Sequence, residues 1–341
     1  MTRAQPANDL PARVPGLRAL SLRLLAGVCL LLAPLAQARS AEPVLPGPLV
    51  TVQWLEAHAD ALNLLSVQED PARYSAAPQF AQKGAYRVLT QAGGHVPGAL
   101  RLPYARVRRQ QRVNDRDVDW MLPTADDFQA LLREVGVRAD RPTVIITDGL
   151  SASDLDMGAR VYWSMKVYGD DRVALLDGGL AGWIEAGKPV TLDAPPETPG
   201  NWQAGSLRHE WLADSDAVEN ARVHGGQIVD ARPLAFHLGL ERMPAVKRAG
   251  HIEGARALPP ELRAQTRRGA LHFLSASQYR DVLAHLDIDP QQPSVVYCNT
   301  GQQAAGAWFV LSQLVGNPQV RLYDASMAGW TAEDRPVVGV R

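Results

Sequence analysis

The sequence predicts an α/β protein in which two parallel sheets are each covered by helices on both faces. The first observation is that short runs of β-branched residues alternate with stretches of helical apolar spacing, which is typical of parallel sheets. The second is that the 341 residues suffice for about two domains. The third is that motifs in the first half recur in the second half in the same order.

The N-terminal segment predicts an export signal rather than part of a domain. Four arginines precede the apolar run "LLAGVCLLLAPLA" (24–36), which leads into a small-x-small pattern formed by Ala36, Gln37 and Ala38. The run is shorter than the roughly 20 residues of a spanning helix, and Pro34 interrupts it. We therefore expect residues 1–38 to be a cleaved signal peptide, with the cut after Ala38. The mature protein is expected to be periplasmic or secreted and not membrane-bound.

Cleavage would leave a single thiol in the mature chain. The sequence has two cysteines, Cys29 and Cys298, and Cys29 lies inside the signal. The exported protein then has no internal disulfide, and Cys298 is either a free reactive thiol or an intermolecular partner. One cysteine and scattered histidines give no metal-ligand spacing. The formal net charge of −1 gives no basis for nucleic-acid binding.

The internal repeat has a period far longer than a solenoid repeat and indicates a duplicated domain. Three pairs of segments match: 93–103 with 249–259, 143–149 with 294–300, and 173–183 with 320–330. The segment rich in proline and polar residues between the copies predicts a linker over 191–206. The predicted domains are 49–190 and 207–341.

Each half predicts the same order of elements. An early strand of the type "GQIVDARP" (226–233) leads to a Gly-His motif, a helix and the strand before 148 or 298. A further helix and a strand ending at 177 or 324 follow. The helix after Cys298 carries one apolar stripe, and the helix of the first half carries the equivalent one. The stripes are Ala304, Trp308, Leu311 and Val315, and Met157, Val161, Met165 and Tyr168. Trp183 and Trp330 are expected to be packing residues.

The loop that begins with Cys298 is the candidate active site. Loops at the carboxyl ends of parallel strands carry the chemistry of α/β proteins. Here the strand leads into Cys298, and the next five residues turn into a helix: Asn299, Thr300, Gly301, Gln302 and Gln303. Converging amide groups and the positive end of the helix favour a thiolate, and also a persulfide whose terminal sulfur is anionic.

Four segments of the second half, in this order, resemble the tandem-domain rhodaneses, which are sulfurtransferases. They are "VDAR" (229–232), "GHIEGA" (250–255), "YCNTGQQA" (297–304) and "LYDASMAGW" (322–330). Weaker copies lie in the first half. The resemblance implies two rhodanese-like domains, a catalytic Cys298 and a catalytically silent first domain. We expect Asp148 to stand where the second half has Cys298, and 66–68 to stand where it has Asp230–Arg232.

The resemblance also implies the chemistry. A small anionic donor such as thiosulfate would give its outer sulfur to Cys298, and cyanide or a thiol, including one on a protein, would accept it. No cofactor is implied. Arg232 is expected either to orient the donor or to brace the loop through Asp230. We interpret His251 and His95 as structural because the silent half keeps its histidine, and Tyr297 as a core residue.

Several positions depart from the family pattern. Many members have a second arginine where this chain has Phe236, and the cysteine loop contains no basic residue. Thiosulfate remains the expected donor in preference to 3-mercaptopyruvate. Arg263, Arg267 and Arg268 are expected to be solvated. A cysteine phosphatase would need an arginine six residues after Cys298, where Ala304 stands. The remaining alternative is a periplasmic persulfide carrier or binding module without efficient turnover.

Overall fold

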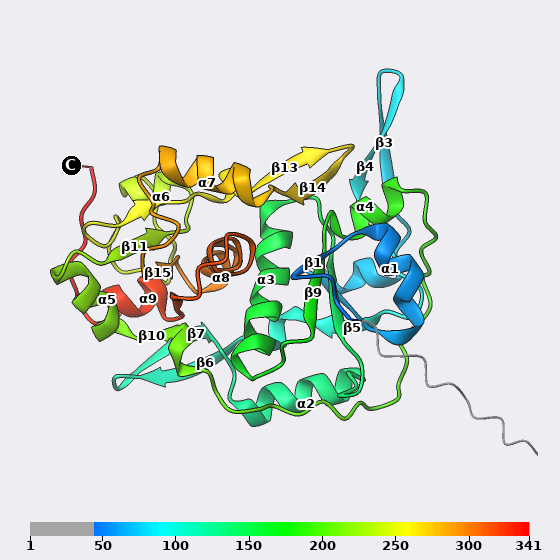
Figure 1. The fold of residues 1–341 in the computed structure, drawn as a ribbon, viewed down its shortest axis with the longest axis horizontal. Helices are drawn as coiled ribbons and strands as arrows, with labels where there is room; N and C mark the ends of the chain where they lie inside the picture. The colour runs from blue at the N-terminus through cyan, green and yellow to red at the C-terminus, as the bar shows by residue number, and fades with distance from the viewer. Residues whose placement is uncertain (1–43, 341) are drawn as a thin grey trace, which may run out of the picture. The chain divides into compact units, whose positions relative to one another are not determined.

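The computed structural model describes residues 44–340, which form two five-stranded parallel sheets (Figure 1). The strand orders correspond position by position, and this confirms the predicted α/β class. The first sheet contains β1 (Leu49–Val50), β9 (Val173–Leu176), β8 (Thr143–Thr147), β2 (Asn63–Gln68) and β5 (Leu100–Pro103), in spatial order. The second contains β10 (Leu212–Ala213), β16 (Val320–Tyr323), β15 (Ser294–Tyr297), β11 (Gln227–Asp230) and β12 (Arg256–Ala257).

Helices cover both faces of each sheet, and side-chain caps fix where several of them begin. Thr124, Ser151 and Ser275 each accept a hydrogen bond from the first turn of the helix that follows. The α-helices are α1 (Val52–His58), α2 (Ala125–Val135), α3 (Ala152–Val167), α4 (Gly179–Glu185), α5 (Ser215–Val223), α6 (Leu234–Leu238), α7 (Ala276–His285), α8 (Gln302–Trp308) and α9 (Ser326–Ala332). Short 3₁₀ helices span Ala59–Ala61, Pro71–Ser75, Tyr104–Arg106, His209–Trp211 and Pro260–Leu262.

The predicted export signal, residues 1–38, lies outside the described residues. Among residues 44–340, none of the helices is both long and apolar enough to cross a membrane. The predicted linker, 191–206, runs along the first half, and most of its residues are exposed. Within it, the Gly200 amide donates to the Arg133 carbonyl and the Gly205 amide donates to the Tyr168 carbonyl, each at 2.7 Å.

The two halves meet through α3 and α8, which lie side by side in the middle of the molecule (Figure 1). Both predicted apolar stripes lie in this region and are buried, apart from the half-buried Val315. After Trp308 the chain continues as a π-helix over Phe309–Leu314. Trp183 and Trp330 are buried packing residues, as predicted, and their indole nitrogens donate to backbone carbonyls.

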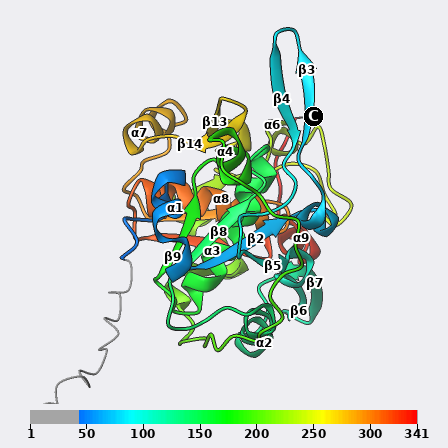
Figure 2. The ribbon, with the colours of Figure 1, turned by 90° about the vertical axis from the view of Figure 1, so that its right-hand side faces the viewer.

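Each half also extends a β-hairpin onto the other half. The hairpin of β6 (Arg109–Val113) and β7 (Arg116–Met121) reaches the second half, where the Leu122 amide donates to the Asp324 carboxylate at 2.6 Å. The hairpin of β13 (Ala264–Arg267) and β14 (Ala270–Phe273) reaches the first half, where the Phe273 amide donates to Asp177 at 3.0 Å. A third hairpin, β3 (Gln79–Lys83) and β4 (Tyr86–Gln91), extends away from the first half (Figure 2).

The strand registers correct one prediction about the silent half. Ser294 begins β15 and pairs with Val320, and Thr143 begins β8 and pairs with Val173, so Ser294 and Thr143 are equivalent. Cys298 lies four residues after Ser294, and Thr147 lies four residues after Thr143. Cys298 therefore corresponds to Thr147 and not to Asp148. Asp148 corresponds to Asn299. The mismatch arises because the loop before α3 is one residue longer than the loop before α8. The assignment of 66–68 to the Asp230–Arg232 position is confirmed by the pairing of β2 with β8 and of β11 with β15.

Candidate active site

Cys298 lies directly after β15 and is held from three sides by its own half. Its side chain is only 1% exposed, and its sulfur accepts a hydrogen bond from the Gly301 amide at 3.1 Å. Gly301 has a φ of 83°, a conformation that favours glycine and turns its amide toward the sulfur. The Cys298 amide donates to Ser326 Oγ at 3.1 Å, and its carbonyl accepts from the Met327 amide at 3.0 Å. The loop therefore presents the sulfur in a fixed position.

The sulfur faces a pocket of about 590 Å³ that both halves line. The second half contributes Cys298 and four of the five predicted loop residues, together with an apolar wall. The first half contributes the opposite wall. The lining residues are Arg108, Trp120, Ala152, Ser153 and Asp156 from the first half, and Pro233, Phe236, Met243, Pro260, Glu261, Cys298, Asn299, Thr300, Gln302 and Gln303 from the second. Cys298 is thus buried beside a cavity rather than enclosed in packed hydrocarbon.

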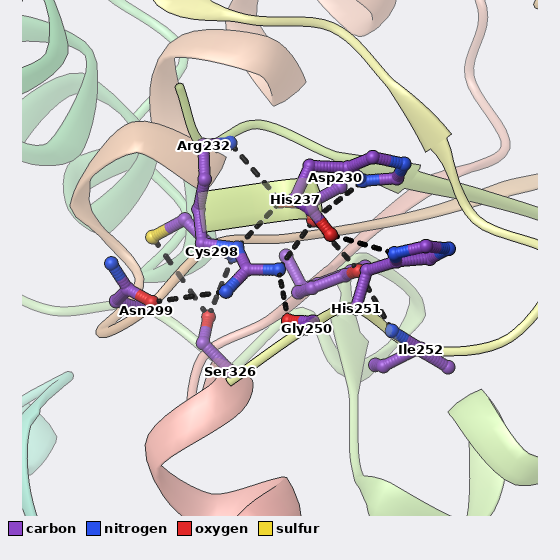
Figure 3. Close-up of polar contacts among 10 residues, drawn as sticks. Asp230, Arg232, His237, Gly250, His251, Ile252, Cys298, Asn299 and Ser326 are labelled. Atoms are coloured by element: carbon purple, nitrogen blue, oxygen red, sulfur yellow. Dashed lines mark hydrogen bonds and ion pairs between the residues drawn. The ribbon is translucent and has the colours of Figure 1, made fainter. Parts of the chain in front are cut away.

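Arg232 contacts Asp230, Gly250 and Asn299 (Figure 3). It is not among the residues that line this pocket. Its guanidinium donates hydrogen bonds to both carboxylate oxygens of Asp230, at 2.8 and 2.6 Å, and to the Gly250 carbonyl at 2.8 Å. A further contact at 3.3 Å reaches the side chain of Asn299, which follows Cys298. Of the two predicted roles for Arg232, this geometry favours the brace.

Asp230 is the centre of a buried network that the sequence did not predict. Its Oδ2 also lies 3.0 Å from His237 Nδ1 and accepts from the Tyr297 hydroxyl at 3.0 Å. Burial raises the pKa of Asp230, but the hydrogen bonds from Arg232 and His237 outweigh it and hold the pKa below its ordinary value. His251 stacks on His237 at 3.8 Å, and its Nδ1 lies 2.7 Å from the His237 carbonyl, which agrees with a structural role. Tyr297 is fully buried, as predicted for a core residue.

Two buried ion pairs from α3 hold the cysteine loop from the other half. Arg160 pairs with Asp324, and its Nη1 reaches the Gly301 carbonyl at 3.5 Å. Asp156 pairs with Arg263 at 2.7 Å, and Arg263 also donates to the Gln303 carbonyl at 2.8 Å. The prediction that Arg263 is solvated is wrong because Asp156, more than a hundred residues away, buries it in an ion pair. Arg267 and Arg268 are exposed, as predicted.

Tyr104 of the first half adds a contact to the loop. Its hydroxyl donates to Gln302 Oε1 at 2.9 Å, and Gln302 Nε2 donates to Ser153 Oγ at 3.3 Å. Burial raises the pKa of Tyr104, so the phenol keeps its proton and remains a donor. The described residues therefore tie Gln302 to the first half through two side chains.

The first half has different side chains at the equivalent loop. Thr147 replaces the cysteine, and Asp148 is buried, accepting from Gln68 at 2.9 Å and from Arg73 at 2.8 Å. Gln68 takes the position of Arg232, and Asp148 takes the position of Asn299. The hydrogen bond between the two positions is kept, but the charged partner is now the acidic acceptor Asp148 instead of the basic donor Arg232. Among the described residues, this loop of the first half has no thiol, and Arg73, the cation beside it, is paired with Asp148.

Among residues 44–340, no group of three or more His, Cys, Asp or Glu is arranged to hold a metal ion. The described site combines a buried thiol, an amide donor on its sulfur and a pocket open to small molecules.

Comparison with known proteins gives a consistent result. The family model "Rhodanese-like domain" matches residues 213–333. The "Sulfur carrier protein TtuD" of Thermus thermophilus is 28% identical over 84% of this chain and 94% of its own length. A "Putative thiosulfate sulfurtransferase" of Haloferax volcanii is 29% identical over 83% of this chain and 92% of its own.

The solved structures show the same fold along the described chain. SseA from Escherichia coli, described as a 3-mercaptopyruvate sulfotransferase with the rhodanese fold, matches with a TM-score of 0.64. It is 24% identical, and the match covers 82% of this chain and 98% of SseA. The match over 213–333 identifies a rhodanese-like domain in the second half. With two sheets of corresponding strand order and relatives aligned along almost their whole length, the chain as a whole is similar to the tandem-domain rhodaneses and has their fold.

Proposed function

We propose that the protein is a sulfurtransferase that carries sulfur on Cys298 as a persulfide. One observation carries the proposal: the Cys298 sulfur accepts a hydrogen bond from the Gly301 amide while its residue lines a pocket between the two halves. An amide that donates to the thiolate also stabilises the anionic end of a bound sulfur chain near it. The names of the relatives, a sulfur carrier and a thiosulfate sulfurtransferase, support the same chemistry.

The reaction has two half-reactions. In the first, the Cys298 thiolate attacks the outer sulfur of thiosulfate, the S–S bond of the donor breaks, and sulfite leaves with the electron pair. In the second, cyanide or a thiolate attacks the outer sulfur of the persulfide and releases the Cys298 thiolate. No external oxidant or cofactor is required, because sulfur moves with its formal charge balanced in each step. Two half-reactions on one nucleophile give ping-pong kinetics.

Thiosulfate is our proposed donor, in preference to 3-mercaptopyruvate. Both are small anions, and the side chains of the cysteine loop are uncharged, so the loop itself does not select a carboxylate. The relative from Haloferax volcanii carries a thiosulfate name. Rates of persulfide formation with the two donors at equal concentration test this choice, and faster loading from 3-mercaptopyruvate would reverse it.

A persulfide carrier without efficient turnover is the second candidate. It is favoured by the Thermus thermophilus relative, which is named a sulfur carrier and aligns over 94% of its own length. A carrier would form the same persulfide on Cys298 and would release it to a partner protein rather than to cyanide.

Intact mass after incubation with thiosulfate tests the proposal. We expect a gain of one sulfur atom in the wild-type protein and none in Cys298→Ala, because the persulfide needs this thiol. Repeated turnover with cyanide would support the enzyme, and a stable adduct without turnover would support the carrier. A wild-type protein that gains no sulfur from thiosulfate, 3-mercaptopyruvate or an organic persulfide would refute both.

We also propose that residues 1–38 direct export, that 49–190 form the silent domain and that 207–341 form the catalytic one. The sulfur chemistry would then take place outside the reducing cytosol. The N-terminal residue of the protein purified from its native cells tests the export proposal: Arg39 is expected, and an intact N-terminus would contradict it.

A further inference from the structure

The wall of the pocket that the first half supplies contains one cation, Arg108, and one large aromatic side chain, Trp120. Arg108 directly precedes β6, and Trp120 lies in β7, so both belong to the hairpin that reaches across to the second half. Neither has an equivalent in the cysteine loop itself. The half without a nucleophile therefore presents a charged surface to the pocket that Cys298 faces.

Arg108 is not neutralised within the part of the chain that the structure describes. No ion pair involves it there. Its buried Nε has no hydrogen-bond partner among these residues, but the same is true of Arg160 Nε and Arg263 Nε, so the missing carboxylate partner is what distinguishes Arg108. By contrast, the three other buried arginines around the site are each committed to a carboxylate, in the pairs Arg232–Asp230, Arg263–Asp156 and Arg160–Asp324. A half-buried guanidinium without a carboxylate partner keeps its charge available to an anion in the pocket.

The ring of Tyr104 helps to fix the position of Arg108. The guanidinium lies over this ring with its central carbon 5.0 Å from the centroid. The charges of Arg108 and Cys298 both act on the pKa of Tyr104, the first lowering it and the second raising it. Tyr104 is thus close to both groups, and an anion between them would meet the cation and the nucleophile together.

The backbone around Trp120 is built to direct its side chain. Trp120 has a φ of 63°, which is strained for a bulky residue, and the register of β6 with β7 shifts between Arg109 and Gln111. Such strain persists only where the surrounding structure fixes it, and here the next turn of chain is held by the Leu122–Asp324 hydrogen bond. This irregularity in the hairpin accompanies the placement of the Trp120 side chain in the wall of the pocket, which Arg108 also lines.

Two carboxylates also line the pocket and must be weighed against the cation. Asp156 is neutralised by its bidentate pair with Arg263. Glu261 is exposed, so water screens its charge. Arg108 therefore remains the group in this wall that favours an anion.

We propose that Arg108 is the residue that binds the anionic leaving group of the sulfur donor, with Trp120 packing against the donor beside it. This inference rests on the proposed sulfur transfer. When the Cys298 thiolate takes the outer sulfur of thiosulfate, sulfite departs with the electron pair of the broken S–S bond, and Arg108 holds its oxygens. The silent half thereby supplies the donor-binding cation that the cysteine loop lacks and that Phe236 does not provide.

Donor kinetics of Arg108→Gln test the proposal. We expect KM for thiosulfate to rise roughly tenfold to a hundredfold, as for the loss of a charge-assisted hydrogen bond, with kcat changed by less than about twofold. Arg108→Lys should recover part of the loss because it keeps the charge without the planar fork. Added salt should raise KM of the wild type and leave KM of Arg108→Gln almost constant.

Arg109→Gln is the matched control, because Arg109 is the exposed neighbour in the same hairpin and does not line the pocket. Its KM should equal that of the wild type. If the wild type gains sulfur while Arg108→Gln keeps the wild-type KM and salt dependence, Arg108 does not bind the donor and the proposed function stands. If the wild type gains no sulfur from any donor, the proposed function fails and this inference fails with it.

Discussion

At the scale of single residues, the pair of Arg232 and Asp230 decides whether the cysteine loop keeps its shape. Both side chains are buried, and Asp230 also accepts from Tyr297. Arg232→Met leaves a buried carboxylate without its cation, so we expect a loss of about 3 to 5 kcal/mol in the free energy of unfolding by urea. Adding Asp230→Asn in the same chain should restore part of this loss, because the unpaired charge is then removed. A loss below about 1 kcal/mol in the single variant would show that the pair does not brace the fold.

The sequence predicted the residues of the cysteine loop because local order alone defines them. A strand, a cysteine and a short loop before a helix suffice to bring Asn299, Thr300, Gln302 and Gln303 to the same pocket. Arg108 and Trp120 were not predicted, since their place in the site depends on how a hairpin docks onto the other half. The wrong prediction for Arg263 has the same origin: nothing near it in the sequence shows that Asp156 lies opposite.

At the scale of elements, the close approach of α3 and α8 depends on a glycine. A Cβ atom added at Gly306 would lie 1.9 Å from Asp156 Oδ1 and 2.2 Å from Arg263 Nη1, so the ion pair that holds the Gln303 carbonyl would have to move. Although alanine favours a helix over glycine, we expect Gly306→Ala to lower the free energy of unfolding by about 1 to 3 kcal/mol. Sulfur loading at saturating thiosulfate should fall as well.

Gly182→Ala in α4 is the control for this substitution. Its added Cβ would lie 3.6 Å from the nearest atom, an ordinary contact, so the change should be neutral or stabilising by up to about 1 kcal/mol. Equal effects of the two substitutions would mean that helix propensity, rather than the contact between α3 and α8, governs Gly306.

The helices and strands themselves could be predicted from local sequence patterns, while the contacts between them could not. The repeated motifs predicted two sheets of one topology, and the spacing of apolar residues predicted both central helices. The one-residue difference between the two loops misled the comparison of Asp148 with Cys298. The match of 143–149 with 294–300 already aligns Thr147 with Cys298, and the strand register agrees with that match. The exchange of hairpins through Asp177 and Asp324 is long-range and leaves no local signal.

At the scale of the whole molecule, the two halves close in the same way, and we expect this closure to be sensitive to acid. His95 pairs by backbone hydrogen bonds with Thr191, and His251 pairs with Val338, so each Gly-His motif ties down the segment that ends its own half. Burial lowers the pKa of both histidines below the ordinary value of about 6.5. The unfolded chain therefore binds protons more readily than the folded one, and the stability from these histidines, complete above pH 6.5, is lost as the pH falls toward their folded pKa values.

Replacing both histidines by glutamine tests this coupling of protonation to folding. Glutamine keeps a donor for the carbonyls of Tyr74 and His237 but does not titrate. We expect the free energy of unfolding of the wild type to decline more steeply between pH 7 and 5 than that of the His95→Gln, His251→Gln double variant. Other groups that titrate in this interval are common to both proteins and cancel in the difference. Parallel curves would mean that neither closure depends on a neutral imidazole, and unequal effects of the two single variants would show that the halves contribute differently to a shared unfolding transition.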